Sequence, residues 1–264
     1  MKKFLSIVLA LAMILCFCPI ISLAVPAALH VESGTVKIDS KAKTVTISKG
    51  TGSTSIAYNE IDGYDVTLTK DFTGVVHSTS SPWKVNNLTV NGGAIEASLS
   101  NFDCTAVEVA GNYTQTNGDV DINNLTKGDY SIALAVKGIT SVTGGALTLN
   151  GYDEALDVAK DFTFSGGEIT LSAEEGDALR VSKPGAKGEI TGSAKITALS
   201  QLVLNNDASL TISGGITDIT GMMGIVDGSL NIKGGELTID APAYAILTNG
   251  DLTISGGSIY ITSE

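Results

Sequence analysis

The chain repeats a short phrase in which apolar and polar residues alternate, a pair of glycines follows, and a second alternating run begins. The phrase is clearest in FTFSGGEITL (162–171), SLTISGGITDIT (209–220) and SLNIKGGELTID (229–240). Strict alternation is typical of strands with one buried face, and glycine pairs between strands are typical of sharp turns that require positive φ. The pattern therefore predicts many short strands joined by tight turns.

The spacing of these turns predicts a solenoid. Glycine landmarks from Gly93 to Gly257 span 164 residues in seven intervals of about 23 residues, a period typical of solenoid repeats. One unit contains three alternating runs, 155–158, 162–164 and 168–171, whose apolar members share a face. The signature phrases of leucine-rich repeats and of calcium-binding nonapeptide repeats are absent. We therefore expect an all-β protein, a right-handed parallel β-helix with three short strands per coil.

Three segments are expected along the chain. Residues 1–24 begin with two lysines, continue through an apolar run and end in Ser-x-Ala, a pattern typical of a secretory signal peptide; an uncleaved membrane anchor is the alternative. Residues 25–84 are less regular, and the stretch TVKIDSKAKTVTIS (35–48) predicts a hairpin that caps the solenoid. Residues 85–264 form the repeat array. The predicted localisation is secreted, extracellular or at the cell surface.

Charge narrows the classes of partner. The formal net charge is −12, and cleavage after Ala24 would remove Lys2 and Lys3 and bring it to −14. Such a surface repels nucleic acid and anionic lipid, so neither is expected as a partner after signal cleavage. Cys104 would be the single cysteine left, which excludes an internal disulfide, so stability must come from packing.

A carboxylate-rich strip is expected on one edge of the solenoid. When the strands that start at Ala106, Ala133, Ala155 and Ala178 are aligned, the acidic turns before them stack on one another. Carboxylates from adjacent coils can share a Ca²⁺ ion, which takes six to eight oxygen ligands in flexible geometry. The candidate calcium ligands are Asp153, Glu154, Asp157, Glu174, Glu175 and Asp177. A solvated acidic edge is the alternative, as is a simple ion pair of Asp157 with Arg180.

Aromatic and basic residues near this strip are candidates for contact with a ligand. Tyr130 and Tyr152 occupy the same register before their strands and could stack on sugar rings, or cover a turn. Lys160, Arg180 and Lys183 could meet an acidic sugar, or take a proton beside a metal-bound uronate in a lyase. A hydrolase of the polygalacturonase kind is not expected, because the array has no Asp-Asp pair and no histidine.

The units FTFSGGEITLSAEEGDALRV (162–181) and GDLTISGGSIYITSE (250–264) resemble repeats of bacterial secreted carbohydrate-binding β-helix proteins, which are similar to pectate-lyase-fold enzymes and occur among clostridial cellulose- and pectin-associated proteins. The likeness covers residues 85–264. It implies binding of plant-type polysaccharide, such as pectin, polygalacturonate or cellulose, with calcium held by acidic turns. The turns 221–228 and 242–250 lack most of those acids, so calcium binding is expected to be confined to the middle coils or to be absent.

The function expected from the sequence is therefore non-catalytic, calcium-assisted binding of a plant-type or acidic polysaccharide. A calcium-dependent uronate lyase is the alternative from the enzyme class. A cell-surface adhesin or structural spacer is the alternative from the structural class.

Overall fold

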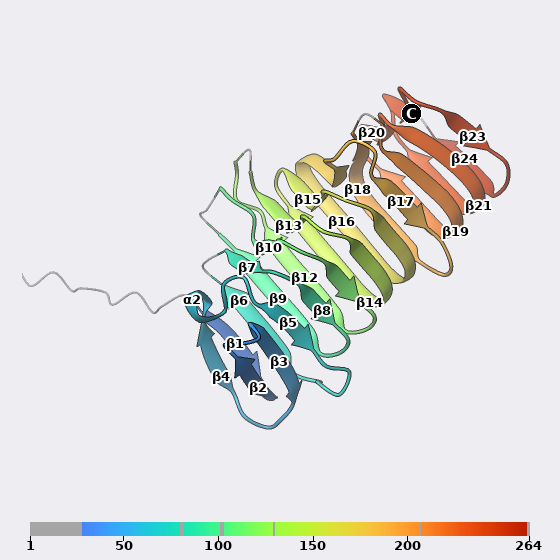
Figure 1. The fold of residues 1–264 in the computed structure, drawn as a ribbon. Helices are drawn as coiled ribbons and strands as arrows, with labels where there is room; N and C mark the ends of the chain where they lie inside the picture. The colour runs from blue at the N-terminus through green and yellow to red at the C-terminus, as the bar shows by residue number, and fades with distance from the viewer. Residues whose placement is uncertain (1–27, 80–81, 101–102, 129, 206, 263–264) are drawn as a thin grey trace, which may run out of the picture.

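The computed structural model describes residues 28–79, 82–100, 103–128, 130–205 and 207–262. Parallel coils of about 22 residues stack into a solenoid of about ten turns, and strands account for about 65% of the structure (Figure 1). The prediction of an all-β solenoid is thus confirmed. The predicted signal peptide, residues 1–24, lies outside the described residues. No helix among the described residues has the length and apolar character needed to span a membrane.

Each coil contributes one strand to each of three parallel sheets. Sheet 1 carries the first strand of each unit, and its members pair in register from one coil to the next. It consists of β7 (Trp83–Val85), β10 (Val107–Val109), β13 (Ile132–Val136), β15 (Glu154–Val158), the ends of β16 (Phe162–Val181) and β18 (Lys195–Leu204), β20 (Met223–Val226) and β22 (Tyr244–Leu247).

Sheet 2 carries the second strand of each unit, which precedes the glycine pair. Strands β14, β16, β19 and β21 run through that turn and so contribute their first part to sheet 2 and their next part to sheet 3. Sheet 2 consists of β2 (Gly34–Asp39), β3 (Thr44–Lys49), β5 (Asp65–Leu68), β8 (Leu88–Val90), β11 (Tyr113–Gln115), the starts of β14 (Thr140–Gly151) and β16, β17 (Lys187–Ile190), the starts of β19 (Ser209–Thr220) and β21 (Ser229–Asp240), and β23 (Leu252–Ile254).

Sheet 3 carries the strand that follows the glycine pair. It begins at the amino-terminal end with antiparallel strands and continues as parallel ones. It consists of β4 (Thr54–Ala57), β1 (Ala28–Glu32), β6 (Val75–Thr79), β9 (Ala94–Leu99), β12 (Asp119–Asn124), the later parts of β14, β16, β19 and β21, the start of β18, and β24 (Ser258–Thr262).

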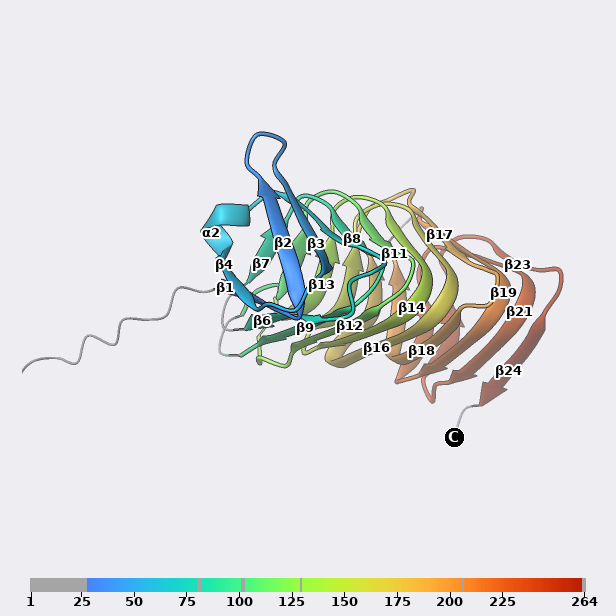
Figure 2. The same cartoon turned by 90° about the horizontal axis from the view of Figure 1, so that it is seen from below.

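The amino-terminal end of the solenoid is capped. β2 and β3 form the predicted antiparallel hairpin, while β1 pairs antiparallel with both β4 and β6. A short helix, α2 (Tyr58–Ile61), follows β4 and buries Ile61. Figure 2 shows the hairpin lying across the first coils. Parallel pairing begins at β3 with β5, so the first complete coil, β5 to β7, lies within residues 65–85.

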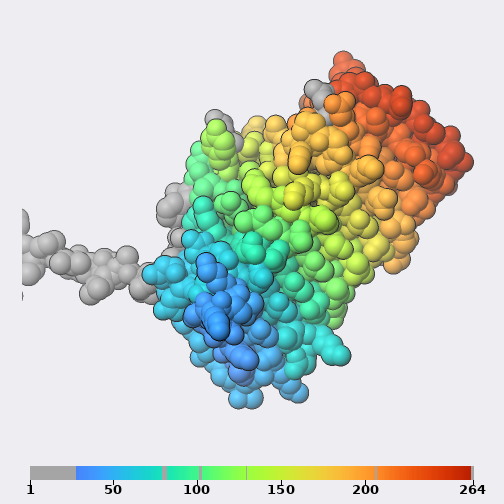
Figure 3. Space-filling model, in the orientation of Figure 1, coloured from blue at the N-terminus to red at the C-terminus, as the bar shows by residue number. Residues whose placement is uncertain are grey.

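The core is a set of ladders formed by equivalent residues of successive coils. One ladder in sheet 1 runs Val107, Leu134, Leu156, Leu179, Leu202, and each member is at most 1% exposed. Coils stack at roughly 4.8 Å, so each apolar side chain meets its copies above and below. Burial of these ladders provides most of the stabilisation. The molecule in Figure 3 is accordingly one elongated body whose sequence colours follow its length.

Glycine is required at the turn between sheets 2 and 3. Gly145 and Gly167 have φ of 81° and 87°, which L-residues with a Cβ rarely adopt. A Cβ on Gly167 would also lie 2.7 Å from the carbonyl oxygen of Gly145 in the preceding coil. Both conformation and space therefore select glycine, which explains the glycine pairs of the sequence.

One coil is longer than its neighbours. The register places Val107 opposite Leu134 and Leu134 opposite Leu156, separations of 27 and 22 residues. The additional residues lie in the segment 125–131, between β12 and β13. The corresponding connection in the next coil, between β14 and β15, has only two residues, 152–153.

Candidate functional site

The turns that lead from sheet 3 into sheet 1 stack into one edge of the solenoid, here called the turn edge. Ile132 pairs with Glu154, which pairs with Asp177, so Tyr130, Tyr152 and Glu175 occupy equivalent positions two residues earlier. A hydrogen bond from the Glu175 amide to the Tyr152 carbonyl, 2.9 Å, links two of these turns. The structure thus brings the two tyrosines and the acidic turn 174–175 together in the order expected.

Exposure divides the six candidate calcium ligands into two groups. Glu174 and Glu175 are exposed on the turn edge and Asp153 is half-buried beside them. Glu154, Asp157 and Asp177 are buried, at 5%, 8% and 7% exposure. Among the described residues no group of three or more histidine, cysteine, aspartate or glutamate side chains is already gathered as a metal site. A calcium ion would therefore have to draw the exposed turn carboxylates together.

The buried acids at the start of the sheet 1 strands are held by a cation and an amide. Arg180 Nη1 donates to Glu154 Oε1 at 2.6 Å and lies 3.8 Å from Asp177 Oδ2. Gln201 Nε2 donates to Asp177 Oδ1 at 2.8 Å. These contacts cross three adjacent coils, so the cluster ties them together as well as carrying charge. The Arg180 side chain is half-exposed.

Asp157 lies in the middle of β15 and has a different partner. It is opposite Arg180 in register, but Lys137 of the preceding coil provides its ion pair, with Nζ 3.6 Å from Oδ2. Oδ1 of Asp157 is buried and has no hydrogen-bond partner among the described residues. A buried carboxylate oxygen normally accepts a hydrogen bond, so this atom is a free acceptor on the outer face of sheet 1.

The ionisation of Glu154 is governed by opposing effects. Burial raises the pKa of Glu154 to about 7, and the negative charges of Asp157 and Asp153 act in the same direction, whereas the bond from Arg180 lowers it. The same bond raises the pKa of Arg180. Burial also raises the pKa of Asp177, while its bond from Gln201 lowers it. Desolvation is the largest of these effects on the pKa of Glu154, because its side chain is only 7% exposed.

Lys160 and Lys183 lie away from the turn edge. Both are exposed in the turns that lead from sheet 1 to sheet 2, at the opposite ends of the sheet 1 strands. Seven residues of mostly extended chain separate Lys160 from Asp153, a distance of about 20 Å at the rise of a β-strand. The two lysines instead line a shallow hollow with Ile139, Asp161 and Pro184. Of the three basic residues predicted from the sequence, only Arg180 therefore lies beside the buried acids.

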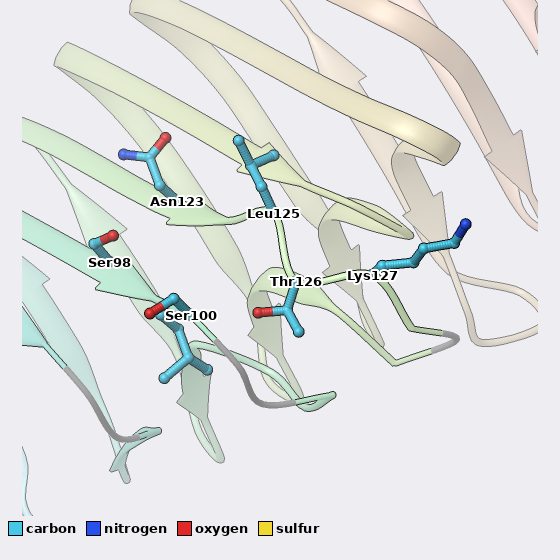
Figure 4. Close-up of a pocket in the computed structure, with 7 residues that line it drawn as sticks. Ser98, Ser100, Asn123, Leu125, Thr126 and Lys127 are labelled. Atoms are coloured by element: carbon cyan, nitrogen blue, oxygen red, sulfur yellow. The ribbon is translucent and has the colours of Figure 1, made fainter.

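A second hollow lies on the turn edge, where β9 and β12 end (Figure 4). It is lined by Ser98, Leu99, Ser100, Asn123, Leu125, Thr126 and Lys127. Leu125 is 52% exposed, Lys127 is exposed, and the buried hydroxyl of Thr126 has no hydrogen-bond partner among the described residues. The lining therefore combines small hydroxyl and amide groups with one exposed apolar side chain and one ammonium group.

The longer loop links this hollow to Tyr130. Tyr130 is 69% exposed and stands three residues after Lys127. Asp103 fixes the end of the loop, because its Oδ1 accepts a hydrogen bond from the Tyr130 amide at 2.8 Å. Asn150 Nδ2 donates to Asn123 Oδ1 at 2.7 Å and extends the polar lining to the next coil. Tyr130 thus follows the hollow closely in the chain, and Asp103 anchors its backbone.

The residues of this hollow were not predicted from the sequence. Ser98, Asn123 and Thr126 are uncharged, and Lys127 falls outside the repeated phrase. One signal was available, because the glycine landmarks Gly118 and Gly145 are 27 residues apart, more than the usual interval. A longer interval in a regular array marks an insertion, and insertions in repeat proteins map to loops that often form the binding face.

Comparison of the chain with protein-family models, with curated proteins and with solved structures gave no match.

Proposed function

We propose that this chain is a secreted, non-catalytic carbohydrate-binding protein that binds an acidic, plant-type polysaccharide along the turn edge. The observation that carries the proposal is the hollow at the ends of β9 and β12, together with the exposed ring of Tyr130 in the adjoining loop. The secreted location and the clostridial pectin- and cellulose-binding type are supported by the leader pattern and by the resemblance of the repeats.

The chemistry of the lining suits sugars. Hydroxyl and amide groups exchange hydrogen bonds with sugar hydroxyls, and an aromatic ring packs against the apolar face of a pyranose. Lys127 is the exposed cation of the hollow, and no carboxylate of a described residue lies within ion-pair distance of it. An ammonium group in this setting favours a sugar that carries a carboxylate. In a protein of net charge −12, such a local cation is needed to attract a polyanionic chain.

The first prediction concerns binding to insoluble acidic polysaccharide. Tyr130→Ala and Lys127→Gln are each expected to reduce retention on calcium-crosslinked polygalacturonate by at least tenfold, a loss of about 1.4 kcal/mol. Lys160→Gln and Lys183→Gln, which change the same kind of charge on the opposite edge, are expected to retain wild-type binding. Pull-down isotherms with the purified proteins measure this.

Two results would contradict this proposal. If the Lys160 and Lys183 variants lost binding while the Tyr130 and Lys127 variants kept it, the ligand would lie on the opposite edge. If the wild-type protein released unsaturated product that absorbs in the near ultraviolet, the protein would be a lyase. Arg180 is a poor base for that reaction, because its guanidinium is bonded to Glu154.

The second prediction concerns calcium. We place the calcium-assisted part of the proposed function on the exposed turn carboxylates Glu174 and Glu175, with Asp153 beside them. Glu174→Gln with Glu175→Gln is expected to abolish calcium binding measured by calorimetry. Glu154→Gln is the matched control, because this acid is buried and bonded to Arg180, and it is expected to leave calcium binding unchanged. Loss of calcium binding in the control alone, or no binding by the wild-type protein, would overturn this placement.

A further inference from the structure

A row of hydroxyl side chains runs along the outer face of sheet 2. One outward residue in each of β3, β5, β8, β11, β14 and β16 pairs in register with its copy in the next coil. Each of these residues is a threonine or a serine, and each is partly exposed between two buried neighbours. The row, here called the hydroxyl ladder, consists of Thr46, Thr67, Thr89, Thr114, Ser141 and Thr163.

The hydroxyl ladder is regular and uncharged. Coils stack at roughly 4.8 Å, so the six members extend over about 24 Å of the solenoid. Charged residues stand at its two ends, because Lys37 pairs with Thr46 and Glu189 pairs with Thr163. A second uncharged polar row, called the adjoining row, lies two residues later in each coil and consists of Ser48, Thr69, Asn91, Thr116, Thr143 and Ser165. In a protein of net charge −12, this pair of rows is suited to a neutral ligand.

The adjoining row is held by internal hydrogen bonds, whereas the hydroxyl ladder is not. Thr116 Oγ1 donates to Asn91 Oδ1 at 2.8 Å, and Thr69 Oγ1 donates to the Ile47 carbonyl at 3.2 Å. Within the described part of the chain, no hydroxyl of the ladder is hydrogen-bonded to another residue. Branching at Cβ restricts χ1, so stacked threonines present their hydroxyl and methyl groups with little rotational freedom. A ligand therefore meets unused hydroxyl groups at a fixed spacing.

The composition of the two rows argues against the common classes of partner. Protein interfaces centre on aromatic or arginine anchors, sugars pack against aromatic rings, and nucleic acids require cations. Neither row contains an aromatic or a charged residue. Because the hydroxyl groups repeat at one spacing, they fit best a ligand whose own hydrogen-bonding groups also repeat in space.

We propose that the hydroxyl ladder and the adjoining row bind the surface of an ice crystal. The rows repeat at roughly 4.8 Å between coils and lie about 6.7 Å apart along each strand. Both spacings are close to repeats of the oxygen atoms on the prism planes of hexagonal ice. The hydroxyl groups exchange hydrogen bonds with lattice water, and the threonine methyl groups order the water between them. Because the ladder is already ordered, binding costs little conformational entropy. This use of sheet 2 is independent of the turn edge.

Ice-growth measurements on the purified protein test this surface. The wild-type protein is expected to shape ice crystals into facets and to lower their freezing temperature below their melting temperature. Thr114→Tyr is expected to abolish both effects, because a ring in the middle of the ladder holds the ice surface away from its neighbours. Thr170→Tyr is the matched control, since Thr170 is a partly exposed, outward threonine on the sheet 3 part of β16. It is expected to act on ice as the wild-type protein does.

A second variant separates the loss of hydroxyl groups from the bulk of a new ring. Thr89→Val combined with Thr114→Val keeps the side-chain shape, removes two hydroxyl groups and is expected to reduce the gap between freezing and melting. Circular dichroism checks that each variant keeps the fold.

Three results would overturn the proposal. In the first, ice grows in the wild-type protein as it does in buffer. In the second, Thr170→Tyr loses the effect on ice as fully as Thr114→Tyr does, which would remove the assignment to sheet 2. In the third, Thr114→Tyr leaves ice growth unchanged but loses binding to microcrystalline cellulose, which would make the ladder a polysaccharide surface. Glu174→Gln with Glu175→Gln should still shape ice, which distinguishes this surface from the turn edge.

Discussion

Replacing Phe162 with alanine is expected to lower the free energy of unfolding by about 3–5 kcal/mol, the usual cost of removing a large aromatic side chain from a core. Phe162 is fully buried on the first part of β16, and its ring lies 5.0 Å, centroid to centroid, from the ring of Phe164. The Phe162 ring fits beside the following coil because its partner there, Gly188, has no side chain. Chemical denaturation followed by circular dichroism measures the change.

Two further variants locate this effect in the ladder. Thr163→Ala changes the neighbouring residue, which points outward, and is expected to shift stability by less than about 0.5 kcal/mol. Gly188→Ala places a methyl group against the Phe162 ring and is expected to cost about 1–3 kcal/mol. Adding Phe162→Leu to the Gly188→Ala variant should recover part of the stability that Gly188→Ala loses. A Phe162→Ala cost below about 1 kcal/mol would mean that the coils do not pack on this ring.

Replacing Arg180 with methionine is expected to destabilise the protein by about 3 kcal/mol at pH 8 and by much less at pH 5. The variant leaves Glu154 and Asp177 buried without their cation. Burial already raises the pKa of Glu154 to about 7, and loss of the Arg180 bond raises it further. A carboxyl whose pKa is higher in the folded state binds more protons there than in the unfolded chain. Stability is therefore greatest below the unfolded pKa, near 4.5, and falls as the pH rises through 7.

The pH dependence can be assigned to Glu154 by a double variant. Glu154→Gln cannot ionise, so on its own it should flatten the decline in stability between about pH 4.5 and pH 7. At pH 8, the free energy of unfolding of the double variant Arg180→Met, Glu154→Gln should be closer to the wild-type value than that of Arg180→Met alone. The reason is that the double variant leaves no uncompensated charge at position 154. Thermal melts at pH 5, 6, 7 and 8 compare the four proteins. If Arg180→Met lowered the stability by the same amount at all four pH values, this account would be contradicted.

The architecture could be predicted from the sequence because one constraint repeats. Alternation places Leu156, Phe162 and Ile169 inside, glycine pairs such as Gly166 and Gly167 mark the turns, and parallel stacking then follows from the period. The hairpin over 35–48 is also confirmed, because its two alternating runs are joined by a polar turn. Each of these inferences depends on local pattern alone.

The arrangement of the candidate sites was less predictable. Proximity in the sequence suggested that Lys160 and Lys183 adjoin the acids, but an extended strand separates the two ends of each unit. Arg180 lies opposite Asp157 in register yet bonds Glu154, because a long side chain reaches diagonally across neighbouring strands.

Because the coils pair residue for residue, the chain can gain or lose a whole repeat without disturbing the pairing of the remaining coils. Ser209 to Ile212 pair with Ser229 to Ile232, so excising residues 209–228 would bring an equivalent strand against the same neighbour. Deletion of one residue would turn every following side chain to the other face of its strand. Duplication or deletion of one whole coil can thus lengthen or shorten the turn edge while the register between neighbouring coils is kept. The length of the turn edge, and with it the length of the proposed binding surface, can therefore change in steps of one coil.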